Sequence, residues 1–150
     1  MKTIVLGLLL LVAGCSGSEM TPEQEVRDYI AKGLEAVENR NSSASMELVH
    51  PRYQDKQGQD VKQLEKLLRL YFFRNRNIYL LGKINEIELL GPDQARVHMH
   101  VAMAATAISD PGLLTSLRAR VYAFELWLVK EDRWLLQEAS WKPAGIGDME

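Results

Sequence analysis

Two histidines stand two positions apart in an apolar stretch, at His98 and His100. Successive side chains of a β-strand point to opposite faces, so residues two apart share one face. Such a pair could begin a metal site, but a zinc site needs three or four protein ligands. The sequence has no Cys/His cluster that would supply the others. We therefore predict no metal site and no other cofactor.

A carboxylate is predicted beside the first of these histidines. Residue types alternate along this stretch, and the apolar residue Met99 falls on the opposite face from His98. If Met99 opposes Phe124 on the next strand, the apolar faces of both strands match, as a buried face requires. His98 then lies opposite Glu125 on the polar face.

A second carboxylate extends this polar face. A two-residue turn at Glu131-Asp132 would pair Lys130 with the residue after the turn and place Glu138 opposite Glu125. The sequence thus predicts a polar row of His98, Glu125 and Glu138. Neighbouring carboxylates can share a proton or hold a divalent cation. The alternative, which the pattern favours, is a solvated outer face or a dimer face.

The only cysteine of the chain, Cys15, stands near its beginning. It follows one cation, Lys2, an apolar stretch at 4–11 and small residues at 13–14, a pattern typical of a secretory signal peptide. The stretch is too short to cross a membrane, which takes roughly 20 apolar residues. A lone cysteine in an exported chain has no partner for an internal disulfide, so its sulfur needs another role.

The residues Val12-Ala13-Gly14-Cys15 resemble the bacterial lipoprotein box, in which leucine usually stands where this chain has Val12. The resemblance implies a signal peptide at 1–14, acylation of Cys15, and a short linker up to residue 20. Ser16, where aspartate is absent, implies the periplasmic face of the outer membrane. The alternative is a secreted protein that keeps a free thiol. An extended linker of this length reaches only about 20 Å, so the domain would lie close to the bilayer.

The rest of the chain has the length of one domain, at 21–143, followed by a tail at 144–150. The formal net charge of the 150 residues is −2, and the basic residues do not cluster. A nucleic-acid-binding domain would show a clustered basic excess, so we predict no nucleic-acid partner.

Three helices are predicted in the first half of the chain. Thr21 and Gln24 form a capping box that opens the first helix, which should fade at 39–43. A short helix at 44–49 should stop before a proline, and a third should open at 58–60 and end at 74–77.

From residue 78 the hydrophobic period changes from helical to alternating, and β-branched and aromatic residues become common. Strands are predicted at 78–90, 94–106, 117–130 and 133–141, with tight turns at 91–93 and 131–132. Helices first and antiparallel strands afterwards predict an α+β domain, with the helices packed on one face of a curved sheet.

This order of elements, closing on Trp134-Leu135-Leu136-Gln137-Glu138-Ala139-Ser140-Trp141, resembles the nuclear transport factor 2 superfamily over residues 21–143. The resemblance implies a cone-shaped α+β barrel: a strongly bent sheet wrapped around a long helix, with a cavity at the open end. The superfamily includes ketosteroid isomerases, polyketide cyclases, dehydratases, transport factors and bacterial lipoproteins.

The resemblance does not extend to the catalytic residues of the isomerases. Those enzymes use a tyrosine and an aspartic acid as an oxyanion hole, with a carboxylate as base. Tyr29 stands where such a tyrosine could occur, but the segment that often holds the base reads His50-Pro51-Arg52-Tyr53. Asp55 follows in a polar loop that we expect to be solvated. The sequence therefore favours Tyr29 as a core residue whose hydroxyl lies near the cavity.

The function predicted from these observations is non-enzymatic binding of a small apolar molecule inside the cone. We expect the pocket to be lined by Tyr29, Leu68, Tyr71, Met99 and Phe124. The alternative is a module for protein–protein contact, either with a second copy of the chain or with another envelope protein. An isomerase- or cyclase-like enzyme is the least favoured of the three.

Overall fold

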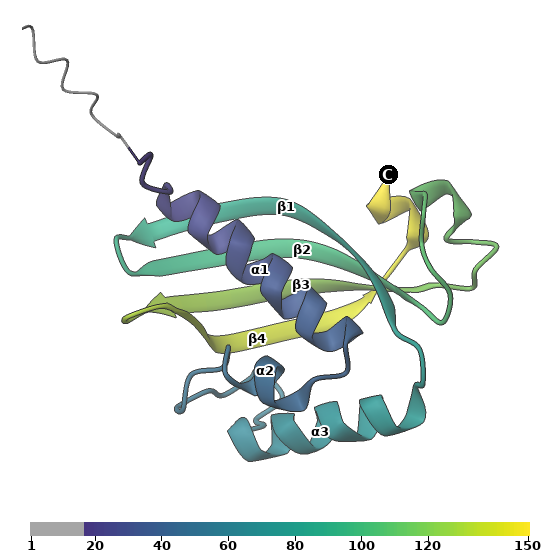
Figure 1. The fold of residues 1–150 in the computed structure, drawn as a ribbon, viewed down its shortest axis with the longest axis horizontal. Coiled ribbons are helices and arrows are strands. Elements are labelled where there is room, and N and C mark those ends of the chain that lie inside the picture. Colours follow the sequence, from purple (N-terminus) through teal and green to yellow (C-terminus); the bar gives the residue numbers. More distant parts are fainter. Residues whose placement is uncertain (1–16) are drawn as a thin grey trace, which may run out of the picture.

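The computed structural model describes residues 17–150, so the predicted signal peptide and Cys15 lie outside the described residues. Helices precede strands (Figure 1): α1 (Pro22–Glu38), α2 (Ser42–Met46), α3 (Val61–Arg74), β1 (Tyr79–Gly91), β2 (Gln94–Ala104), β3 (Arg120–Lys130) and β4 (Trp134–Ala144). Two single-turn 3₁₀ helices occur at Pro111–Leu113 and Ile146–Met149. The strands form one curved antiparallel sheet in the order β1-β2-β3-β4, which confirms the predicted α+β class.

Helix α1 runs diagonally across one face of the sheet (Figure 1). The predicted capping box is present: the Thr21 hydroxyl accepts from the Gln24 N–H, and the Gln24 side chain accepts from the Thr21 N–H. One side of the helix is buried against the sheet, through Val26, Tyr29 and Ile30. Within residues 17–150, no helix is long and apolar enough to span a bilayer.

Helix α2 is shorter than predicted and ends at Met46, not at residue 49. The backbone beyond it pairs with β4: the Leu136 N–H donates to Leu48 O at 2.9 Å, and the His50 N–H donates to Leu136 O at 2.9 Å. Val49 therefore forms a parallel bridge with Leu136. Hydrogen bonds to the sheet replace the helical ones, because this segment covers the edge of β4.

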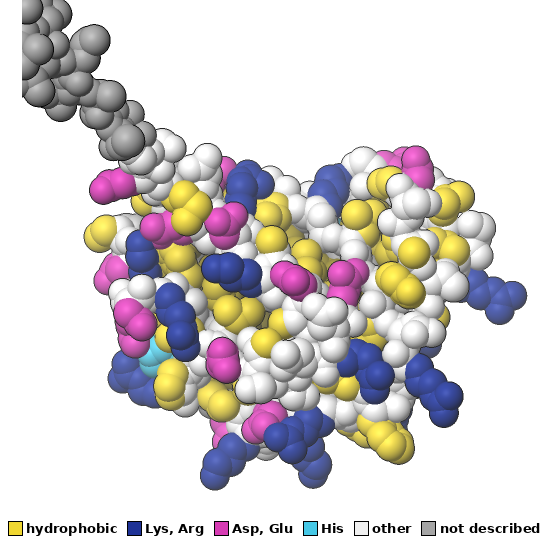
Figure 2. All heavy atoms as spheres, viewed as in Figure 1, with side chains coloured by type: hydrophobic (Ala, Val, Ile, Leu, Met, Phe, Trp, Pro, Cys, Tyr) yellow, Lys and Arg dark blue, Asp and Glu magenta, His cyan; other side chains and the backbone are white. Residues whose placement is uncertain are grey.

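Helix α3 lies below α2, on the side of the molecule away from the start of α1 (Figure 1). Asp60 caps it, with a capping box to Gln63. Only Phe72 of this helix is buried, whereas Leu67, Leu70 and Phe73 are exposed, Phe73 by 84% of its surface. Basic side chains with hydrophobic ones among them gather along this lower edge (Figure 2).

The register of the central strand pair is as predicted. Met99 opposes Phe124, and His98 opposes Glu125. Strand β3 begins at Arg120, three residues later than predicted, because the chain before it forms a turn in which Arg118 has a φ of 53° and Leu114 is fully buried.

Two separate cores lie on the two faces of the sheet. The larger one joins α1 to the inner face and is centred on Val26, Val97 and Leu128, each at most 1% exposed. The smaller one lies on the outer face, at the opposite end of the strands, where Leu114 and Met149 cover Val121 and Ala102. The last residues of the chain thus pack against the back of the sheet.

Candidate binding cavity

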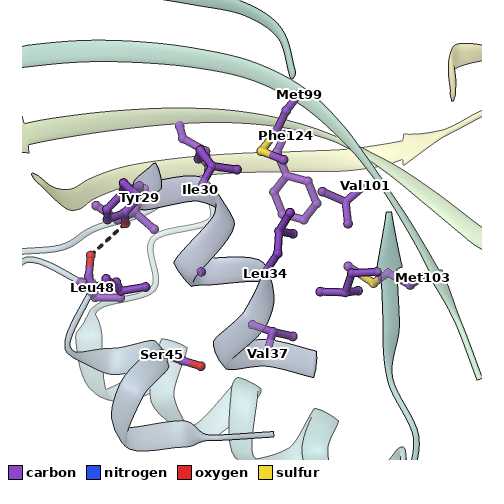
Figure 3. Close-up of a pocket in the computed structure, with 15 residues that line it drawn as sticks. Tyr29, Ile30, Leu34, Val37, Ser45, Leu48, Met99, Val101, Met103 and Phe124 are labelled. Atoms are coloured by element: carbon purple, nitrogen blue, oxygen red, sulfur yellow. Dashed lines mark hydrogen bonds between the residues drawn. The ribbon is translucent and has the colours of Figure 1, made fainter. Parts of the chain in front are cut away.

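A cavity of about 220 Å³ lies between α1, the segment around α2, and the inner face of the sheet (Figure 3). Its walls are apolar because α1 presents one helical face and each strand presents every second residue. The lining residues are Tyr29, Ile30, Gly33, Leu34, Val37, Ser45, Leu48, Val49, Leu80, Met99, Val101, Met103, Phe124, Leu126 and Leu136.

Two hydroxyl groups are the only polar side-chain atoms among these lining residues. The Tyr29 hydroxyl donates to Leu48 O at 2.9 Å, the bond drawn in Figure 3, and the Ser45 hydroxyl donates to Asn41 O at 2.8 Å. Burial raises the pKa of Tyr29 above its ordinary value, so the proton stays on the oxygen. Both hydroxyls therefore already donate to backbone carbonyl oxygens, and a bound molecule would find no free side-chain hydrogen-bond donor among the lining residues.

One end of the cavity, where Leu126 lies opposite the fully buried Val97, is called the closed end, and the other, where Met103 lies opposite the exposed Arg120, is called the open end. Tyr29, Met99 and Val101 are buried, whereas Val37 and Met103 are only partly buried. One close contact shapes the wall near the middle: a Cβ added to Gly82 would lie 2.7 Å from Leu34 Cδ1. The absence of a side chain at Gly82 allows this leucine to pack against β1.

The structure brings three of the five predicted pocket residues to the cavity: Tyr29, Met99 and Phe124. Leu68 and Tyr71 are not among the lining residues, which corrects that part of the prediction. Their helix, α3, packs beside α2 and makes few backbone contacts with the sheet, so its side chains reach only the outer margin.

Sequence reasoning missed several lining residues that the same periodicities predict. Gly33, Leu34 and Val37 follow Tyr29 at helical spacing on α1. Met103 follows Met99 at even spacing on β2. Hydrophobic period alone places them on the correct face, but it does not say where the packing leaves a hollow.

The predicted polar row is wrong at its second carboxylate. Glu125 lies opposite Ser140, and Glu138 lies opposite Trp127. The turn pairs Lys130 with Trp134, one residue later than a two-residue turn would. A bulge between Trp127 and Leu128 then shifts the register again.

The remaining pair, His98 and Glu125, lies on the outer face of the sheet, because these residues alternate with the cavity-lining residues Met99 and Phe124. Glu125 has two cationic neighbours: Lys56 Nζ at 3.8 Å and Arg96 Nη1 at 4.0 Å. Lys56 also lies 4.3 Å from the ring centre of Trp127. Within residues 17–150, no group of three or more His, Cys, Asp or Glu side chains is arranged to hold a metal ion.

The loop after α2 also lies outside the cavity. Asp55, expected in a solvated loop, is only 5% exposed, because the Gln59 N–H and the Tyr53 hydroxyl both donate to its carboxylate. His50 is buried as well; its Nδ1 accepts from the Arg52 N–H, and its Nε2 lies 2.9 Å from a Glu131 carboxylate oxygen. These polar groups hold the loop in place, and none lines the cavity.

No known protein family and no curated protein matches the sequence. Solved structures do match the fold. An NTF-2 like protein of unknown function from Shewanella oneidensis matches with a TM-score of 0.58 and 16% identity, over 81% of this chain and 98% of that one. A hexachlorocyclohexane dehydrochlorinase from Novosphingobium barchaimii matches with a TM-score of 0.61 and 9% identity, over 82% and 86%.

A longer protein, Bd1075 from Bdellovibrio bacteriovorus, matches with a TM-score of 0.63 and 10% identity. That match covers 81% of this chain but only 41% of the other. The similar structures thus include an enzyme and a protein of unknown function, and at such identities they report on architecture alone. The described residues therefore have the nuclear transport factor 2-like fold.

Proposed function

We propose that this protein binds a small apolar molecule in the cavity between α1 and the sheet without converting it chemically. The composition of the lining carries this proposal. Apart from the hydroxyls of Tyr29 and Ser45, the lining side chains are apolar, and both hydroxyls already donate to the backbone. A polar group placed there would lose its hydration without gaining a donor, which costs free energy. An apolar group would gain by leaving water.

The size of the cavity bounds the ligand and its affinity. At about 30 Å³ for each water-sized group, 220 Å³ holds roughly seven such groups. Burial contributes about 0.8 kcal/mol for each methylene, or about 5 kcal/mol in all. That corresponds to a dissociation constant of roughly 0.1–1 mM from the cavity alone. Tighter binding would need contacts outside it.

The same lining argues against acid–base chemistry in the cavity. A catalytic acid or base must reach the reacting atom within hydrogen-bond distance. Tyr29 is the only titratable residue in the lining, and its proton is held by burial and by Leu48 O. The carboxylate of Asp55 belongs to the loop after α2 and does not line the cavity. These observations support binding over conversion.

Binding is tested by titrating 15N-labelled protein, residues 16–150, with 1-decanol and following the amide resonances by NMR. This piece contains both hydrophobic cores. We expect shifts at Met99, Val101 and Leu34. The filling variant Leu34→Trp should abolish them, whereas Leu67→Trp, the same change on the exposed face of α3, should not. Shifts confined to α3 would refute the proposal.

We also propose that the domain is an envelope lipoprotein anchored through Cys15. The sequence before Cys15 supports this, and α1 begins only seven residues after it, so the cavity would lie near the bilayer. Replacing Cys15 by serine should move the protein from the membrane fraction to the soluble periplasmic fraction. Mass spectrometry of the wild-type amino-terminal peptide should show the added acyl groups. An unmodified cysteine would refute this assignment.

A second candidate function is protein–protein contact through α3. Leu67, Leu70 and Phe73 stand at intervals of three residues and are exposed, and Arg69 and Arg74 flank them. This surface suits a partner with apolar side chains and an acidic rim. Native mass spectrometry of the wild type and of Phe73→Ser, without added ligand, would show a self-association that depends on this face. A monomer in both cases would leave only a different protein as the partner.

A further inference from the structure

A gradient of polarity runs along the cavity face of β3. Leu126, Phe124, Tyr122 and Arg120 occupy alternate positions, so all four side chains point to the same face. The residues change in order from aliphatic to aromatic, then to hydroxylated, and then to cationic. Leu126 and Phe124 line the cavity, and the two polar residues follow beyond its lining.

Strand β2 gives the direction of this gradient. Val97 opposes Leu126 at the closed end and is fully buried. Met103 opposes Arg120 at the other end, where both residues are at least partly exposed. The polarity of β3 therefore rises from the closed end of the cavity towards solvent, as the polarity of an amphiphile does.

Two hydroxyls lie near Arg120 at the open end. The Tyr71 hydroxyl donates at 3.6 Å to Met103 Sδ, a weak acceptor that an anionic oxygen would replace, and Met103 is the cross-strand partner of Arg120. Burial and the neighbouring Tyr122 raise the pKa of Tyr71, while the positive charge of Arg120 partly opposes them. The two tyrosines and the arginine thus lie within electrostatic reach of one another. Among residues 17–150, the ion pairs do not include Arg120.

We infer that the ligand is an amphiphile whose aliphatic tail fills the cavity and whose anionic head binds Arg120, with Tyr71 and Tyr122 as neighbouring donors. This inference rests on the proposed function and names the chemical class of its ligand. A guanidinium offers paired donors that match the oxygens of a carboxylate. The unbranched side chains of Met99 and Met103 adapt to a flexible tail more readily than branched ones do. The tail needs no hydrogen bond, and the cavity offers no donor.

Three probes with the same ten-carbon tail test the head group: undecanoate, in which the carboxylate supplies the eleventh carbon, 1-decanol and decyltrimethylammonium. Affinities are measured by NMR titration of residues 16–150 at neutral pH, below the micellar concentrations of the two charged probes and below the solubility limit of 1-decanol. We expect undecanoate to bind most tightly and the cation most weakly. Added salt should weaken the binding of undecanoate but not of 1-decanol, because salt screens only the charged contact.

Variants locate the charge. Arg120→Gln should weaken undecanoate binding roughly fivefold, the effect of a partly exposed ion pair, and leave 1-decanol binding unchanged. Arg120→Lys should restore part of the affinity. The matched control is Lys142→Gln, which removes one positive charge from the outer face of β4, opposite Ala123, and should change neither affinity. Since Arg120 and Lys142 are both exposed, neither change should alter the fold, which the amide spectrum verifies.

The outcomes separate this inference from the function on which it rests. Equal binding of all three probes, or a Lys142→Gln effect equal to that of Arg120→Gln, would overturn the anionic head and leave apolar binding intact. Binding of 1-decanol that Arg120→Gln also weakens would show a structural role for the arginine and overturn the inference. Failure of all three probes to bind would overturn both.

Discussion

The two faces of the sheet are made by the same strands, yet they differ in how many polar side chains they carry and in what those side chains bond to. On the outer face, charges are numerous and paired, as between Arg96 and Glu88 and between Lys56 and Glu125. On the inner face, the cavity lining has only two hydroxyls, both of which donate to backbone oxygens, and Arg120, which has no ion-pair partner among residues 17–150, lies beyond the lining. Apart from the ion pair of Glu25 and Lys130 at one end of the inner core, the ion pairs that involve strand residues lie on the outer face, and the cavity on the inner face is left available for a ligand.

The largest expected effect follows from comparing a polar substitution on each face of β2. Val97→Asp would bury an unpaired carboxylate at a fully buried site of the inner core. We expect a loss of more than about 4 kcal/mol, a large part of the stability of a typical domain. His98→Asn, one residue along on the outer face, should change stability by less than about 0.5 kcal/mol. Urea unfolding followed by circular dichroism measures both, and equal losses would contradict the two-face description.

The next effect concerns the buried hydroxyl. Tyr29→Phe removes the Tyr29 hydrogen bond to Leu48 O, which keeps its bond from the Leu136 N–H, and the loss of one such hydrogen bond costs about 0.5–1.5 kcal/mol. Tyr79→Phe removes the hydroxyl of an exposed tyrosine at the start of β1 and should change stability by less than about 0.5 kcal/mol. The same urea titration compares them. Equal effects of Tyr29→Phe and Tyr79→Phe would contradict a stabilising role for the buried hydroxyl of Tyr29.

A smaller effect tests the shape of the cavity. Gly82→Ala places a methyl group against Leu34 Cδ1, which can turn into the hollow. We expect a loss of about 1 kcal/mol or less, with weaker binding of 1-decanol because the cavity shrinks. Gly147→Ala, at the outer face, adds a methyl group that meets no atom within 4 Å and should change neither. Unchanged binding in Gly82→Ala would place the ligand elsewhere.

The smallest effect is a pH dependence at the end of the inner core. Lys130 Nζ and Trp134 Nε1 donate to Glu25 Oε2 at 2.6 and 3.0 Å, and these bonds lower the pKa of Glu25. A carboxyl whose pKa is lower when folded stabilises the fold above its unfolded pKa. That contribution is lost as the pH falls through the folded pKa. Urea midpoints between pH 3 and 7 should therefore fall less in Glu25→Gln than in the wild type, and parallel curves would contradict this role.

Much of the fold was predictable from local patterns. The capping boxes at Thr21 and Asp60 mark helix starts because they satisfy backbone donors within one turn. The pairing of Met99 with Phe124 follows from alternation, because a slip by one residue would bury polar side chains. The prediction that Leu68 and Tyr71 line the pocket was wrong, since α3 packs beside α2 and makes few backbone contacts with the sheet.

The sequence by itself determined which residues share a face, because helical and strand periodicities are properties of the backbone. It also determined the register of β2 against β3. Only the tertiary structure decided where Glu138 lies, because the turn pairs Lys130 with Trp134 and the register shifts again between Trp127 and Leu128. Only the tertiary structure decided, too, that the hydroxyls of Tyr29 and Ser45 donate to backbone oxygens and that Arg120 has no ion-pair partner among residues 17–150. The position of a cavity and of the donors around it depends on how whole elements pack against one another. A local sequence pattern does not contain the distances between those elements.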